Sequence, residues 1–268
     1  MVSAAPVTEE TLNFFASFDI SITDLLGQSE GCAPICLNTP NHQTWKIGSC
    51  GKPLNGVTMR IGEGGEIQYK GRNVMMGYLK SPEETLHTLD AEGWIHTGDV
   101  GRVDEDGFYY VTGRLKEIIV TAGGENIPPV YIENSIVELC PVISNIIVIG
   151  DKKKYLSCLI TLKCEVDKEG EPTNRLSMLS LKKSQELGSS ATTTQEVIED
   201  PLWKEYIDSV IDRYNKEKSI SNAQQIRKWT ILEKDMSIDH GELTATMKLK
   251  RNVVHQHYNK EIEQMYTE

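Results

Sequence analysis

The chain has 268 residues and a formal net charge of −11, with 28 basic against 39 acidic side chains. Apolar residues make up 39% and charged residues 25%, which is typical of a globular protein and argues against wholesale disorder. The acidic excess argues against a nucleic-acid-binding surface, which needs a basic face. No apolar run reaches the ~18 residues of a membrane span. The first ten residues lack a basic segment followed by an apolar one, so we expect no signal peptide.

The cysteines are interpreted as free thiols. An even count of six could form three disulfides, but that reading is strong only for a small secreted chain. Cys158 lies in the apolar run 156–162, which is typical of a core strand. Cys32 and Cys36 have no second pair of ligands to complete a zinc site. We therefore expect a chain with reduced cysteines in the cytoplasm.

The first third of the chain is expected to form antiparallel hairpins and one helix. Ser81-Pro82-Glu83-Glu84 has the residues of a helix start: a capping hydroxyl, a proline at the first helical position, and a glutamate that can reach back to the cap. The strands expected in this part, joined by turns rich in glycine and acid, are 57–61, 66–70, 99–103 and 108–111.

After Gly113 strands alternate with helices, which favours a compact α+β module. The strands expected here are 117–120, 145–149, 156–162 and 228–233. The helices expected are one that begins at Pro128-Pro129, an amphipathic one over 203–218 and a closing one over 248–265. Residues 165–194 are polar and are interpreted as an exposed insertion with some helix. We place the domain boundary near Arg114–Glu117.

Four segments contain residue types that packing alone does not require. Glycines let a ligand approach the backbone, a carboxylate can accept both hydroxyls of a ribose, and an arginine offers a fork of donors to phosphate. Taken singly, each segment could also be a surface turn, a connector or the solvated start of a helix. The segments are Leu26–Gly31, Gly93–Asp99, Gly113–Pro129 and Leu243–Arg251.

In this order and spacing the segments resemble the adenylate-forming (AMP-binding) superfamily of acyl-CoA synthetases, luciferases and peptide-synthetase adenylation domains. Within it the chain is most similar to long-chain acyl-CoA synthetases of the bubblegum type. The resemblance covers nearly the whole chain, least securely residues 165–200. It implies an α+β fold, with the end of a large adenylation domain, β-rich and barrel-like, over 1–115. A small α+β C-terminal domain, with a short sheet flanked by helices, would follow over 116–268. The strings that carry the resemblance are GWIHTGD (93–99), GRLKEIIVTAGGENIPPVYIE (113–133) and LTATMKLKR (243–251).

The resemblance also implies roles for single residues. Asp99 would hold the ribose hydroxyls of ATP or AMP, and Arg114 would contact ribose or phosphate. Lys248 would stabilise the carboxylate and the α-phosphate during adenylation, and Lys116 matches the hinge of the small domain. Glu30 matches the glutamate associated with Mg²⁺. The remaining residues expected at the nucleotide site are Ser29, Gly27, Leu26, Ala4 and Ala5.

Two departures from the family pattern bear on the nucleotide. The family has a tyrosine where this chain has Leu26, so a flat ring worth about 0.5–1.5 kcal/mol of stacking is lost. Ser3 stands where the segment around Ala4 and Ala5 usually has glycine. The phosphate loop of the family, with its lysine, is not present in these residues, so the resemblance implies a fragment or a short isoform.

The implied function is an ATP-dependent ligase that activates long-chain or very-long-chain fatty acids through an acyl-adenylate, with ATP, Mg²⁺ and CoA. Positioned cations and a metal suit this chemistry because charge accumulates on phosphate oxygens. One alternative is a catalytically inactive interaction or regulatory module with the same fold, and another is a ligase for a different carboxylate, such as an aromatic acid. The expected location is the cytoplasm, with room for peripheral association at intracellular membranes.

Two further features have competing explanations. The cations from Lys248 to Arg251 could instead attach the chain to a membrane surface. His255 and His257 could suggest a metal, but residues two apart on a helix face different ways, so we interpret them as surface histidines.

Overall fold

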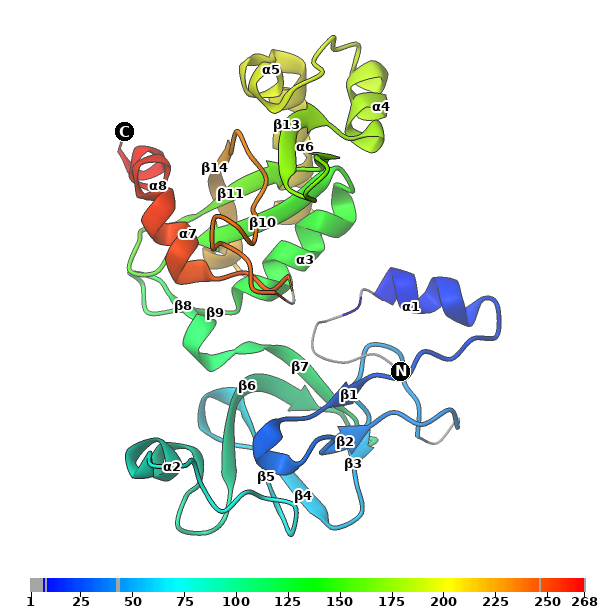
Figure 1. The fold of residues 1–268 in the computed structure, drawn as a ribbon, viewed down its shortest axis with the longest axis vertical. Coiled ribbons are helices and arrows are strands. Elements are labelled where there is room, and N and C mark those ends of the chain that lie inside the picture. The colour runs from blue at the N-terminus through cyan, green and yellow to red at the C-terminus, as the bar shows by residue number, and fades with distance from the viewer. Residues whose placement is uncertain (1–6, 8, 42–43, 246, 268) are drawn as a thin grey trace. The chain divides into compact units, whose positions relative to one another are not determined.

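The structure is a computed structural model that describes residues 7, 9–41, 44–245 and 247–267 (Figure 1). The chain divides into two compact units, Met1–Ile118 and Ile119–Glu268. Within the described ranges, no helix has the length and apolar character needed to cross a bilayer.

The first unit is built around a four-stranded antiparallel sheet in the order β4-β5-β6-β7, with a smaller sheet in the order β1-β2-β3. Both predicted hairpins are present: β4 pairs with β5, and β6 with β7. The strands are β1 (Leu25–Leu26), β2 (Cys36–Leu37), β3 (Lys52–Pro53), β4 (Val57–Ile61), β5 (Glu66–Gly71), β6 (Ile95–Val103) and β7 (Tyr109–Arg114), and the helices are α1 (Glu9–Ala16) and α2 (Pro82–Thr88).

One face of this sheet is covered by apolar side chains. Ile67 and Tyr69 of β5 and Ile95 of β6 are fully buried and pack with Ile35 and Cys36 of the smaller sheet. Burial of a large apolar side chain is worth about 1.5–3 kcal/mol, so this cluster fixes the smaller sheet on the larger one. The segment that contains Glu30 lies between β1 and β2 and is positioned by this packing.

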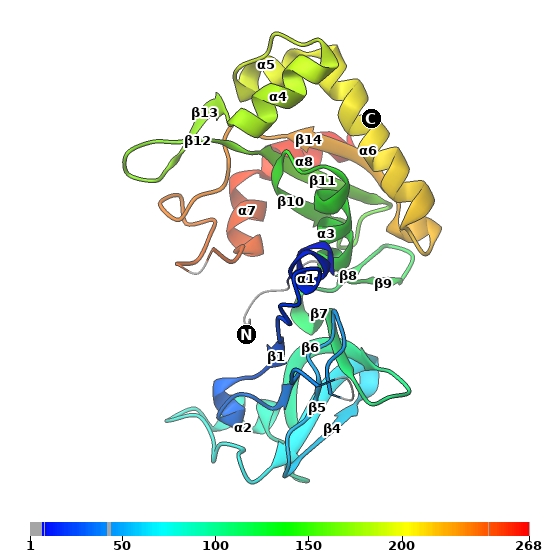
Figure 2. The same ribbon diagram turned by 90° about the vertical axis from the view of Figure 1, so that its right-hand side faces the viewer.

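The second unit is a three-stranded sheet, β10-β11-β14, with helices on both faces (Figure 2). β11 runs antiparallel to β10 and parallel to β14, and all seven of its residues are buried. The strands are β8 (Ile119–Val120), β9 (Asn126–Ile127), β10 (Ile143–Ile149), β11 (Leu156–Leu162), β12 (Cys164–Val166), β13 (Pro172–Leu176) and β14 (Ile226–Ile231). The helices are α3 (Pro129–Leu139), α4 (Met178–Leu187), α5 (Thr194–Glu199), α6 (Pro201–Glu217), α7 (Arg251–His257) and α8 (Asn259–Tyr266).

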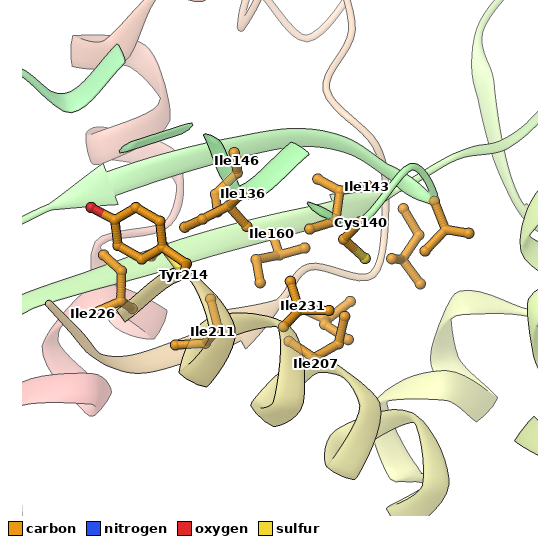
Figure 3. Packing of buried hydrophobic residues seen from close by; sticks show 14 of the residues in the cluster. Ile136, Cys140, Ile143, Ile146, Ile160, Ile207, Ile211, Tyr214, Ile226 and Ile231 are labelled. Carbon is orange, nitrogen blue, oxygen red and sulfur yellow. The ribbon is translucent and has the colours of Figure 1, made fainter. Parts of the chain in front are cut away.

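Alternation along the strands divides the core of the second unit into two layers. Ile146 and Val148 of β10 pack with α3 and α6, whereas Ile147 and Ile149 pack with α7 and α8. Figure 3 shows the first of these layers, in which apolar side chains of α6 face those of the sheet. The α+β fold predicted from the sequence is therefore confirmed.

Several expectations about single elements are wrong. Residues 165–194 are exposed over 165–170 and contain the helix α4, as expected, but the rest of the segment also packs on the core: Leu176, Ser184 and Ala191 are buried, and the indole N–H of Trp203 donates to Ser184 Oγ at 3.0 Å. The expected strand over 117–120 is reduced to β8, because Leu115–Glu117 forms a 3-10 turn.

Two helix ends also differ from expectation. The closing helix begins at Arg251, three residues later than predicted, and is interrupted at Tyr258, where φ is −107° and ψ is 26°. At the start of α2 the expected cap by the Ser81 hydroxyl does not form with the described residues; instead the Thr85 hydroxyl donates to the Ser81 carbonyl at 2.9 Å. All six cysteines are free, as predicted.

Candidate functional site

A cavity of about 640 Å³ lies in the first unit. Its walls come from segments that are far apart in the sequence. They include Gln28 and Glu30 from the turn after β1, Thr97 and Gly98 from β6, and Lys116 after β7. The cavity therefore gathers residues from three of the four motif segments.

Glu30 lies in a 3-10 turn, Ser29–Gly31, and is held from two sides. Its backbone carbonyl accepts the amide of Met75 at 2.8 Å, and its Oε1 accepts the hydroxyl of Tyr78 at 2.6 Å. The bond to the carboxylate, with burial as a smaller cause, raises the pKa of Tyr78. Ser29 is exposed beside it. Glu30 thus presents a carboxylate of fixed orientation at the cavity.

A side-chain hydrogen bond connects this turn to β6. Gln28 Nε2 donates to the carbonyl of Thr97 at 2.9 Å across a separation of 69 residues. Gly27, one position earlier, has no room for a side chain, because a Cβ there would lie 2.6 Å from the Cβ of Ala33. The close approach of two backbone segments therefore explains why glycine occupies position 27.

β6 contains a bulge where the sequence suggested a nucleotide loop. Glu66 pairs with Val100 but Gln68 pairs with His96, so three residues of β6 face one residue of β5. Gly98 adopts a φ of +70°, which glycine tolerates and other residues rarely adopt. The segment from Ile95 on is therefore part of a strand, β6, and the bulge lies within it.

Glu66 holds the bulge in place, and sequence reasoning did not assign it to the site. The carboxylate is 6% exposed; its Oε1 accepts the amide of Gly98 at 2.9 Å, and its Oε2 accepts Gln68 Nε2 at 3.0 Å. His96 Nδ1 lies 2.7 Å from the same Oε2, which places the ring proton on Nδ1. A glutamate at an inward-facing strand position was the only signal of this role in the sequence.

Asp99 is the last residue of the bulge and is paired with Arg114. The two residues face each other across β6 and β7, with Arg114 Nε 3.2 Å from Asp99 Oδ1. Only 9% of the Asp99 side chain is exposed, against 60% for Arg114. The amide of Asp99 donates to Thr97 Oγ1 at 3.0 Å, so the bulge also fixes its backbone.

The other predicted site residues lie in different surroundings. Leu26 is 8% exposed and packs in the hydrophobic core of the first unit, so its role toward a nucleotide stays a prediction. Lys116 is exposed in the turn Leu115–Glu117 and lines the cavity. Ala4 and Ala5 fall outside the described residues.

Lys248 belongs to the second unit and lies in a tight hairpin that the sequence had assigned to a helix. Leu243 and Leu249 form an antiparallel bridge, and the amide of Thr244 donates to the carbonyl of Lys248 at 2.8 Å. Met247 has a φ of +59°, and the side chains of Met247 and Lys248 are exposed.

The described part of the chain contains no group of three or more His, Cys, Asp and Glu side chains that could hold a metal ion. His257 is exposed and His255 is half-buried, so only one of the two is a surface histidine as predicted. Cys32 is exposed whereas Cys36 is buried in the core.

Each of the two units matches a known protein family. The AMP-binding enzyme family matches residues 1–79, and the AMP-binding enzyme C-terminal domain matches residues 116–183. Long-chain-fatty-acid–CoA ligase ACSBG2 of Gallus gallus is 45% identical over 99% of this chain and 35% of its own length. The ACSBG2 ligase of Homo sapiens is 45% identical over 98% and 40%, and the ACSBG1 ligase of Bos taurus is 44% identical over 99% and 37%. The chain thus spans a little over a third of the length of these relatives.

Solved structures share the fold at lower identity. O-succinylbenzoate coenzyme A synthetase from Bacillus subtilis, in complex with ATP and magnesium ion, matches 93% of this chain and 44% of its own, with a TM-score of 0.63 and 24% identity. The adenylation domain of a carboxylate reductase from Mycobacterium chelonae matches 99% and 38%, with a TM-score of 0.72 and 20% identity. On the family matches and the 44–45% identity along nearly its whole length, the chain belongs to the AMP-binding enzyme family and is similar to the bubblegum-type long-chain-fatty-acid–CoA ligases.

Proposed function

We propose that the chain takes part in the ATP-dependent activation of long-chain fatty acids to acyl-CoA. The observation that carries the proposal is that Gln28–Glu30 and Thr97–Gly98, two segments expected to bind nucleotide, line one cavity and are joined by a hydrogen bond. The substrate class rests on the relatives, which are named long-chain-fatty-acid–CoA ligases.

The nucleotide would bind along the β6 bulge. A Cβ at Gly98 would meet open space, so the backbone there is accessible to a ligand. Asp99 would accept the ribose hydroxyls, and its pairing with Arg114 orients the carboxylate for this. Arg114, largely exposed, keeps donors of its guanidinium fork for ribose or phosphate.

The residues present suit magnesium bound together with ATP. Mg²⁺ is usually held by one or two carboxylates plus substrate phosphates, and Glu30 supplies one carboxylate at the cavity. When bound there, the ion would offset the negative charge of the phosphates. Tyr78 keeps the Glu30 carboxylate in one orientation for that purpose.

The reaction has two steps, and each needs a different arrangement of cations. The carboxylate of the fatty acid attacks the α-phosphate of ATP, which gives acyl-adenylate and pyrophosphate; the thiol of CoA then attacks the acyl carbon and AMP leaves. Lys248 would stabilise the charge on the carboxylate and α-phosphate in the first step. Lys116, in the turn that ends the first unit, would be the hinge that exchanges this arrangement for one that admits CoA. We place the activity in the cytoplasm, supported by six free cysteines, with peripheral association at membranes through the fatty substrate.

The direct test is to incubate the chain with palmitate, MgATP and CoA and to measure pyrophosphate and palmitoyl-CoA. Formation of both above background supports the proposal. Lys248→Ala should suppress pyrophosphate release more than thioester formation from supplied palmitoyl-adenylate. Lys250→Ala is the matched control, because it removes a second exposed lysine two residues further on.

Other outcomes favour the other readings of the family resemblance. Release of pyrophosphate with an aromatic acid but not with palmitate would favour a different carboxylate. A folded chain that binds no MgATP and releases no pyrophosphate would contradict the proposal and favour a catalytically inactive module.

A further inference from the structure

The hairpin Leu243–Leu249, which carries Lys248, is anchored in the core by the leucines at its two ends. Leu243 is buried and Leu249 half-buried against α7 and α8, whereas Ala245, Met247 and Lys248 are exposed. A lysine side chain loses conformational entropy when it is fixed, so an exposed lysine acts efficiently only from a fixed backbone. The contacts that hold this hairpin therefore bear on the proposed role of Lys248.

Glu242, the residue before the hairpin, is 1% exposed and joins three segments. Its Oε2 accepts the amide of Ser237 at 3.2 Å, and its Oε1 accepts the hydroxyl of Tyr258 at 2.9 Å. His257 Nδ1 lies 3.2 Å from the same Oε1. The backbone carbonyl of Glu242 accepts the amide of Lys250 at 2.7 Å, which closes the hairpin on its far side.

The interruption between α7 and α8 explains how Tyr258 and His257 reach this carboxylate. The backbone of Tyr258 leaves helical geometry, with φ −107° and ψ 26°, so the chain changes direction there. Two neighbouring side chains can then contact one group, which neighbours on a continuous helix would not do. The predicted closing helix was wrong at the position that makes this contact.

A second carboxylate fastens the exit of the hairpin. Arg251, the first residue of α7, pairs with Glu133 of α3 in a bidentate arrangement, at 2.8 Å to Oε1 and 2.6 Å to Oε2. Glu133 Oε1 also accepts the amide of Val148 in β10 at 2.8 Å. The pair is largely buried, with 18% of the Arg251 side chain and 11% of the Glu133 side chain exposed.

We propose that Glu242 and Glu133 are positioning residues for Lys248, holding the two ends of its hairpin through buried carboxylates. The inference rests on the proposed role of Lys248 in adenylation. Replacing a buried ion pair by apolar groups often leaves the stability of a protein unchanged. Stability alone therefore does not explain why such a pair is present. The two parallel hydrogen bonds of the Arg251–Glu133 pair do fix the orientation of the Arg251 side chain. Together with the bonds of Glu242, they constrain the path of the chain on either side of Lys248.

The test begins with hydrogen exchange in the chain as it is. Glu242→Gln should accelerate exchange at the amides of Thr244, Lys248 and Lys250 by about tenfold, while the β10–β11 ladder keeps its protection. Glu133→Gln should act most strongly at Lys250. Glu233→Gln, at an exposed glutamate of the same unit, is the matched control and should change nothing.

Half-reactions then separate positioning from stability. In Glu242→Gln, pyrophosphate release with palmitate and MgATP should fall about tenfold while thioester formation from supplied palmitoyl-adenylate is retained. Unchanged hairpin exchange, equal loss of protection in β10–β11, or equal loss of both half-reactions would each overturn the inference. Failure of the proposed function looks different: the unsubstituted chain would release no pyrophosphate, while the exchange data would still decide whether the carboxylates hold the hairpin.

Discussion

The buried carboxylate of Glu66 offers a sharp test of how the candidate site is built. It receives bonds from the amide of Gly98 on Oε1 and from His96 and Gln68 on Oε2. In Glu66→Gln the shape is kept, but one oxygen becomes an NH₂ group that faces a donor. If the nitrogen of the new amide group points toward Gly98, one hydrogen bond is lost. If it points toward His96 and Gln68, two are lost, so we expect the first orientation.

The cost can be worked out from this geometry. A hydrogen bond to a charged group contributes about 1.5–3 kcal/mol, and the Gly98 amide then faces another donor. We therefore expect Glu66→Gln to lower the free energy of unfolding of the first unit by about 2–3 kcal/mol. Since Asp99 is part of the bulge, affinity for MgATP should fall as well.

Urea unfolding, followed by tryptophan fluorescence, to which Trp94 directly before β6 contributes, and by circular dichroism, measures the change in stability. Glu63→Gln is the control, because Glu63 is exposed at the tip of the β4–β5 hairpin and its loss should cost less than about 0.5 kcal/mol. If Glu66→Gln is as mild as this control, the carboxylate does not hold the bulge and the account of the site is refuted.

Two further predictions concern titratable groups. Cys32 is exposed, whereas burial raises the pKa values of Cys36 and Cys50 to about 12, so at pH 8 a thiol reagent should modify Cys32 rapidly and these two only after denaturation. Rapid modification of Cys36 or Cys50 in the folded chain would contradict the packing. Burial, and secondly a neighbouring arginine, lowers the pKa of His255 below its usual value near 6.5, so the unfolded state binds the proton first as pH falls. The second unit should therefore lose stability as pH drops below about 6.5, and His255→Gln should reduce this slope in denaturation measured between pH 7 and pH 5.

Sequence patterns predicted correctly those elements whose geometry depends on residues close to one another in the chain. The β4–β5 and β6–β7 hairpins follow from alternating polarity on either side of turn residues. α6 follows from apolar residues at helical spacing, with Trp203, Ile207 and Tyr214 fully buried. In these elements the nearest neighbours in sequence also determine the geometry.

Composition misled where tertiary contacts turn polar residues inward. The segment before α6 is rich in serine and threonine, yet Ser184 accepts the indole N–H of Trp203 and donates to the carbonyl of Ala191, so its hydroxyl is satisfied without water. A polar side chain with both bonds made inside the protein can be buried at little cost. Polarity alone therefore does not distinguish an exposed insertion from a folded part of the core.

The candidate site shows the same limit in a different form. The family resemblance pointed to Asp99, Glu30 and Lys248, whose side chains suit phosphate chemistry, but not to Glu66 or Glu242, which contact other protein groups. Both supporting glutamates are buried beside a backbone irregularity, a strand bulge in one case and an interrupted helix in the other. Each irregularity leaves backbone or side-chain donors that the regular hydrogen-bonding ladder does not satisfy, and a buried carboxylate accepts them. Because these donors come from different segments of the chain, they meet only when the chain is folded. A motif read from one sequence therefore does not identify a buried glutamate that supports the site in this way.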